Sequence, residues 1–144
     1  VKGQFPVLDL PATENEVQAI RTLLQQSSIT TELYTKKEAT EGNLLKSSQS
    51  QLVHVATHGF FVPEKANNSK DALLRSGIVM AGLDTDSLHD GIMTAYEMAG
   101  LSMPQTELLV FSACETGLGD IQNGQGVYGL QRSARVAGAQ AVLM

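Results

Sequence analysis

Apolar residues recur every three or four positions along residues 14–27, which predicts a helix with one apolar face. The apolar positions are Val17, Ile20, Leu23 and Leu24. Thr13 precedes this segment and Glu16 follows three positions later, so the pair predicts a capping box at the start of the helix. An amphipathic helix is therefore expected near the start of the chain.

Three further helices are expected along the chain. Thr40 predicts the N-cap of a short helix, and Thr94 with Glu97 predicts a capping box for another. Residues 126–138 repeat apolar side chains on one side of a longer helix, which Gly138 ends.

Runs of consecutive apolar residues between these helices predict buried strands. The expected strands lie at 51–56, 76–80, 107–112 and 139–144, with a short β-prone stretch at 31–34. The polar segments 63–72 and 82–91 are expected to be surface loops. The alternation of strands and helices predicts an α/β fold with a mainly parallel sheet and helices on both faces. In such sheets, ligands bind outside the carboxyl ends of the strands.

The length of 144 residues predicts a single domain spanning residues 1–144. The final residues begin an apolar strand that stops at Met144, so we expect the complete domain to continue past this residue.

Composition narrows the classes of partner. The formal net charge is −5 and no basic tract is present, which argues against direct binding of nucleic acid. No apolar run approaches the roughly 20 residues of a membrane span. The first residues have no long apolar region and no cleavage signature, so a secretory signal is not expected. A single cysteine excludes an internal disulfide and fits a reducing compartment, so a cytoplasmic location is expected.

The single cysteine also suggests the chemistry. Cys114 follows the strand expected at 107–112, and His58 follows the strand expected at 51–56. A thiol attacks a carbonyl as the thiolate, and a neighbouring imidazole can remove its proton. The backbone N–H groups of Gly59 and Cys114 would then hold the developing oxyanion. The competing interpretation is that Cys114 is a small buried apolar residue.

The acidic residues beside the thiol have two interpretations. Glu115 and Asp120 are either solvated loop charges or receivers of a basic substrate side chain. Arg75, set among apolar residues, is either part of a structural ion pair or a receiver of acidic groups.

The other two histidines suggest no metal site. His54 and His58 are four residues apart but lie on an expected strand, without the glutamate of an HExxH motif. His54 is therefore expected to be a packed or hydrogen-bonded structural residue, and His89 a solvated one. We assign no metal and no cofactor.

Three glycines raise a further possibility, a nucleotide-binding loop. Gly124, Gly126 and Gly129 match G-x-G-x-x-G and open a helix. The preceding strand ends more than ten residues earlier, whereas a dinucleotide-binding loop follows its strand at once. A substrate-flanking loop with a helix start explains these glycines better.

Two segments together, LVHVATHGFF (52–61) and ELLVFSACETGLGD (107–120), resemble the CHAT domain, a bacterial member of the caspase and separase group of cysteine peptidases. Further segments resemble that family in the same order, from about residue 10 to the end of the chain. They are LPATENEVQAI (10–20), ALLRSGIVMAG (72–82), DGIMTAYEMAGL (90–101) and GQGVYGLQRSARVAGAQAVLM (124–144).

The resemblance implies a caspase-like three-layer sandwich, with the sheet between two layers of helices. It implies that His58 is the general base, that Cys114 is the nucleophile and that Gly59 completes the oxyanion hole. The motif S-A-C-E-T-G differs from the Q-A-C-x-G of true caspases, so cleavage after aspartate is not implied. CHAT domains commonly follow helical repeats that bind partners, so a regulatory partner or repeat region outside this chain is expected.

The sequence is therefore compatible with two functions. The first is a cysteine endopeptidase that cleaves a protein or peptide substrate and belongs to a larger regulated bacterial protein. The alternative is a catalytically inactive scaffold that keeps the fold and binds a partner.

Overall fold

A five-stranded sheet with the order β3-β2-β1-β4-β5 forms the centre of the protein. The structure is a computed structural model that describes residues 9–62, 70–82, 90–115 and 125–144. The strands are β1 (Leu52–Phe61), β2 (Ser76–Val79), β3 (Ile92–Thr94), β4 (Leu108–Glu115) and β5 (Ala141–Leu143). The helices are α1 (Pro11–Gln26), α2 (Glu41–Ser47), α3 (Ala95–Ala99) and α4 (Gln125–Val136), with 3₁₀ turns η1 (Lys36–Glu38) and η3 (Ala72–Leu74).

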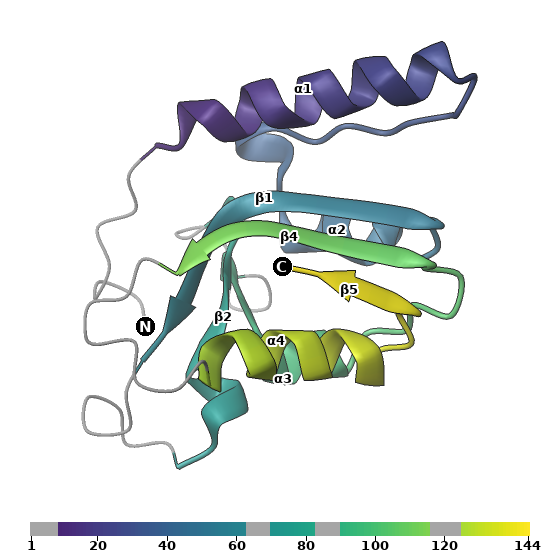
Figure 1. The fold of residues 1–144 in the computed structure, drawn as a ribbon. Helices are drawn as coiled ribbons and strands as arrows, with labels where there is room; N and C mark the ends of the chain where they lie inside the picture. Colours follow the sequence, from purple (N-terminus) through teal and green to yellow (C-terminus); the bar gives the residue numbers. More distant parts are fainter. Residues whose placement is uncertain (1–8, 63–69, 83–89, 116–124) are drawn as a thin grey trace.

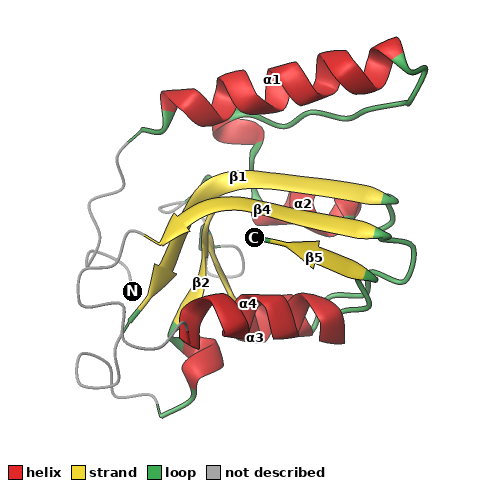
Figure 2. Cartoon of the chain, viewed as in Figure 1, coloured by secondary structure: helices red, strands yellow, loops and turns green. Residues whose placement is uncertain are grey.

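The sheet has a parallel part and an antiparallel part. Strands β1, β4 and β5 run parallel to one another, whereas β2 pairs antiparallel with β1 and β3. Helix α1 lies over one face of the sheet, and α3 and α4 lie over the other (Figure 1, Figure 2). This three-layer α/β arrangement, with a mostly parallel core flanked by helices, is consistent with the caspase-like sandwich that the sequence predicts.

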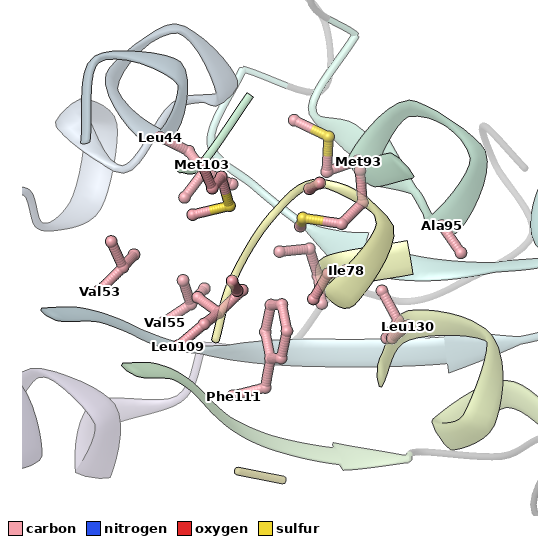
Figure 3. Close-up of a cluster of buried hydrophobic side chains, with 14 residues drawn as sticks. Leu44, Val53, Val55, Ile78, Met93, Ala95, Met103, Leu109, Phe111 and Leu130 are labelled. Carbon is pink, nitrogen blue, oxygen red and sulfur yellow. The ribbon is translucent and has the colours of Figure 1, made fainter. Parts of the chain in front are cut away.

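The core fills the space between the sheet and the layer of α2, α3 and α4. Alternate residues of β1 and β4 enter it, and Leu44 of α2 and Leu130 of α4 close it from the other side (Figure 3). The strand residues in this cluster are Val53, Val55, Leu109 and Phe111, each at most 9% exposed. The intervening positions of these strands face α1. The period of two along each strand therefore separates a buried core face from a more open face.

Three of the predicted helix ends are confirmed. The Thr40 hydroxyl accepts a hydrogen bond from the Asn43 backbone N–H and caps α2. Thr94 and Glu97 form the capping box of α3. Gly138, two residues past α4, has a φ of +112°, a left-handed conformation that favours glycine.

The predicted capping box of α1 is wrong. The helix begins at Pro11, where a proline is well suited to the first turn, and no side chain caps it. Thr13 instead donates its hydroxyl proton to the Leu10 carbonyl. The Glu16 side chain points away from the helix start and reaches the sheet.

The sequence also missed one strand and predicted another that does not form. Ile92–Thr94, which lie between an expected loop and an expected cap, form β3 because β2 offers them an antiparallel partner. The β-prone stretch at 31–34 is not a strand, since no strand in the described part of the chain pairs with it. Intrinsic preference alone does not form a strand without a partner.

Candidate functional site

The two residues expected to form a dyad lie on neighbouring strands in the middle of the sheet. Strands β1 and β4 pair in parallel along eight positions, and in this register His58 is the partner of Cys114. Figure 1 shows the two strands side by side, with their carboxyl ends together. The backbone therefore brings positions 58 and 114 together, and their chemical roles stay a prediction.

Both strands run further than the sequence predicts. His58 lies inside β1, which continues to Phe61, and Cys114 lies inside β4, which ends at Glu115. The extension of β1 has a clear cause: Gly59, Phe60 and Phe61 pair antiparallel with β2. The expectation that both residues follow the ends of their strands is thus wrong by a few positions.

Strand β2 flanks the candidate site on the side away from β4. The Thr57 hydroxyl donates to the Val79 carbonyl and fixes the two strands beside His58. Gly59 is buried and is in register with both Glu115 of β4 and Ile78 of β2. The participation of its N–H in an oxyanion hole stays a prediction.

The structure describes the two predicted substrate receivers, Glu115 and Asp120, only in small part. Glu115 is the last residue of β4, and the side chains of Cys114 and Glu115 lie outside the described part of the structure. Asp120 lies outside the described residues altogether, as do His89 and Gly124.

A polar bridge that the sequence analysis missed lies on the open face of the sheet. Glu16 of α1 places Oε1 2.8 Å from His54 Nε2, and its Oε2 accepts a hydrogen bond of 3.1 Å from the Ser112 hydroxyl. His54 is therefore a hydrogen-bonded residue, as the sequence predicts. The spacing offers a signal in retrospect, because the register partner of His54 is Val110, two residues before Ser112, so that His54 and Ser112 share one face of the sheet.

Arg75 is buried at the start of β2, with 5% of its surface exposed. Its Nη1 donates to the Val62 carbonyl at 2.9 Å, and its guanidinium carbon lies 5.3 Å from the centroid of the Phe61 ring. Within the described residues it forms no ion pair, and its buried Nε has no hydrogen-bond partner. Of the two interpretations, the structural ion pair is not found there.

Gly129, the last glycine of the G-x-G-x-x-G match, has a packing role in α4. A Cβ at this position would come within 2.9 Å of the Ser76 hydroxyl oxygen on β2. The absence of a side chain lets α4 approach the sheet closely. Helix packing accounts for this glycine without a nucleotide.

The described residues contain no group of three or more His, Cys, Asp or Glu side chains that could hold a metal ion. None of the helices in the described segments is long and apolar enough to cross a membrane.

Comparison with known proteins gives one family. Searches of curated proteins and of solved structures produced no match to the chain. A model of the CHAT domain family matches residues 1–144, the whole chain. The chain therefore belongs to the CHAT domain family, a caspase-like group related to peptidases.

Proposed function

We propose that this protein is a cysteine endopeptidase domain in which His58 and Cys114 form the catalytic dyad. The observation that carries the proposal is the parallel register of these two positions on neighbouring central strands. Matched positions on adjacent strands share one face of the sheet. Position 114 is one residue before the carboxyl end of β4, and position 58 is three residues before that of β1. In open α/β sheets, ligands bind outside the carboxyl ends of the strands.

The proposed reaction uses the two residues in sequence. His58 takes the thiol proton, and the thiolate attacks the carbonyl carbon of the scissile peptide bond. The C–N bond breaks as the imidazolium returns the proton to the leaving amine, which leaves a thioester on Cys114. Water then hydrolyses the thioester, releases a carboxylic acid and restores the thiol. The N–H groups of Gly59 and Cys114 are the proposed donors to the oxyanion.

Membership of the CHAT family supports this function. We further propose a protein or peptide substrate, and a regulatory partner or helical-repeat region outside this chain. The single thiol of the chain favours a reducing compartment such as the bacterial cytoplasm.

Glu115 is the proposed receiver of a basic substrate side chain, because it is the last residue of β4, at the end of the sheet where open α/β sheets bind ligands. Asp120 is proposed to assist it. Peptide libraries that vary the residue on either side of the scissile bond test this. A preference for Lys or Arg that is lost in Glu115→Gln supports the assignment, and an unchanged preference rejects it.

A peptidyl chloromethylketone tests the proposed nucleophile in the full-length protein. We expect covalent labelling of Cys114, identified by mass spectrometry, at a rate that falls sharply in His58→Ala. A thiol that stays unlabelled in the folded protein, or one labelled equally in both proteins, would reject the peptidase and favour the scaffold function.

A further inference from the structure

One carboxylate joins helix α1 to both strands that carry the proposed dyad. The two oxygens of Glu16 have different partners: Oε1 lies 2.8 Å from His54 Nε2 on β1, and Oε2 accepts from the Ser112 hydroxyl on β4 at 3.1 Å. We refer to Glu16, His54 and Ser112 as the α1 bridge. An ionised carboxylate accepts hydrogen bonds at both oxygens, so it suits a position between two donors.

The α1 bridge lies directly beside the candidate site. Ser112 is two residues before Cys114 on β4, and its register partner Ala56 is two residues before His58 on β1. Along a strand this is a separation of about 6–7 Å on the same face. The bridge therefore contacts β4 two residues before Cys114 and β1 four residues before His58.

The connectivity of the bridge does not suit catalysis by Ser112. A serine nucleophile needs a base that accepts the proton of its own hydroxyl and later returns it to the leaving group, as the histidine of a triad does. Here the carboxylate lies between the hydroxyl and the imidazole, so Ser112 has no imidazole partner. The arrangement instead fixes the positions of three elements relative to one another.

The α1 bridge adds to an apolar contact of α1 that is only partial. Val17, Ile20 and Leu24 are half-buried, Leu23 is 64% exposed, and no residue of the helix is fully buried. Polar contacts therefore contribute to the placement of the helix. Its other ion pair joins Glu14 to Lys36 on the surface, between side chains 41% and 74% exposed. By contrast, the side chains of His54 and Glu16 are 15% and 35% exposed, and a partly buried charge-assisted contact is the stronger kind.

We propose that Glu16 is a positioning residue for the His58–Cys114 dyad. By holding β1, β4 and α1 together two to four residues before the site, it keeps the two reacting groups at a fixed separation. The inference rests on the proposed function, since it assigns Glu16 a role in a reaction at positions 58 and 114.

The test measures alkylation of Cys114 by iodoacetamide in the full-length protein, across pH 5.5–9.5. Near pH 7, the alkylation rate in excess of that of His58→Ala is the part that depends on His58. In Glu16→Ala we expect this part to fall on the order of 10- to 100-fold, because small misplacements of reacting groups have effects of this size. The pH profile should then move toward that of a free thiol, whose pKa is about 8.5. Urea unfolding of each variant, measured in parallel, gives its folded fraction. A variant that reacts slowly only because it unfolds would show a lower folded fraction.

Matched variants make the test specific. Glu16→Gln should keep most of the rate, because its amide can accept from His54 and donate to the Ser112 hydroxyl. Ser112→Ala and His54→Phe each remove one half of the bridge, because neither new side chain can bond to the Glu16 carboxylate. Both should give intermediate losses, which keeps the test valid if Glu16→Ala does not fold. Glu14→Ala, on the same helix, should react at the wild-type rate.

The two proposals fail in different ways. The positioning role of Glu16 is rejected, and the dyad stands, if His58→Ala is slow but the folded Glu16→Ala protein reacts like the wild type. If Glu16→Ala does not fold, wild-type reactivity of both Ser112→Ala and His54→Phe gives the same conclusion. If His58→Ala itself reacts like the wild type, the dyad is rejected and the role of Glu16 with it.

Discussion

His58 of β1 is the parallel register partner of Cys114 of β4, in the middle of a five-stranded sheet. The two residues are far apart in the sequence, and the pairing of β1 with β4 brings them together. Eight consecutive matched positions fix this register, and the alternation of core residues along both strands reinforces it. A slip of one residue would turn the apolar positions away from the core, so the adjacency of positions 58 and 114 follows from the stability of the fold.

Replacing either member of the dyad should stop peptide cleavage in the full-length protein. We expect Cys114→Ala and His58→Ala each to lower kcat on the order of 10³-fold or more, since residues that act as a unit lose most of their effect together. The measurement is turnover of a protein or peptide substrate. His89→Ala is the matched control, because the sequence gives this histidine no catalytic role. Full turnover by either dyad variant would contradict the assignment.

The core of β4 should tolerate truncation poorly. Leu109 is fully buried in the main cluster, so Leu109→Ala removes apolar contacts and leaves a cavity. We expect a loss of about 2–5 kcal/mol in the free energy of unfolding, measured with urea. Leu23→Ala, at a position 64% exposed, should change it by less than about 0.5 kcal/mol. Equal effects would mean that the cluster does not form the core.

The capping box of α3 should contribute measurably to stability. Thr94→Ala removes the acceptor of the Glu97 backbone N–H and should cost about 1 kcal/mol in the free energy of unfolding. Thr22→Ala is the control, because the hydroxyl of Thr22 bonds to the Gln18 carbonyl inside α1 and caps nothing. Alanine has the higher helix propensity, so this control should be neutral or slightly stabilising. A cost at Thr22 that matches the cost at Thr94 would argue against the cap.

The close packing of α4 on β2 gives a prediction with a built-in rescue. Gly129→Ala should destabilise the protein, because the new Cβ would lie 2.9 Å from the Ser76 hydroxyl oxygen. In the double variant with Ser76→Ala, the nearest Ser76 atom becomes the Cβ at 3.9 Å, an ordinary contact. The double variant should then regain stability relative to Gly129→Ala, aided by the helix propensity of alanine. Thermal unfolding of the three proteins measures this, and additive losses would contradict the proposed contact.

Much of the fold could be predicted from the sequence because the periods of apolar residues differ between helices and strands. The positions of β1, β2, β4 and β5 follow from short apolar runs, and two of the capped helices follow from local residues. The antiparallel pairing of β2 could not be predicted from these runs. Strand β3 could not be predicted either, because its three residues are too few for a pattern and form a strand only beside β2.

The candidate site was also only partly predictable. The sequence indicates His58 and Cys114 because each follows an apolar run, whereas the register that pairs them depends on the whole sheet. The local spacing of Thr13 and Glu16 predicts that Glu16 caps α1. In the structure the Glu16 carboxylate instead bonds to His54 and Ser112 on the sheet. The period of two along the strands places His54 and Ser112 on one face of the sheet, but no pattern in the sequence links Glu16 to that face.

The separation between a ring nitrogen of His58 and Sγ of Cys114, in a crystal structure of the full-length protein, tests the central claim most directly. We expect one of Nδ1 or Nε2 to lie within about 4 Å of the sulfur, close enough for a proton to pass between them. A thiol and an imidazole directed to opposite faces of the sheet, with no such approach, would contradict it.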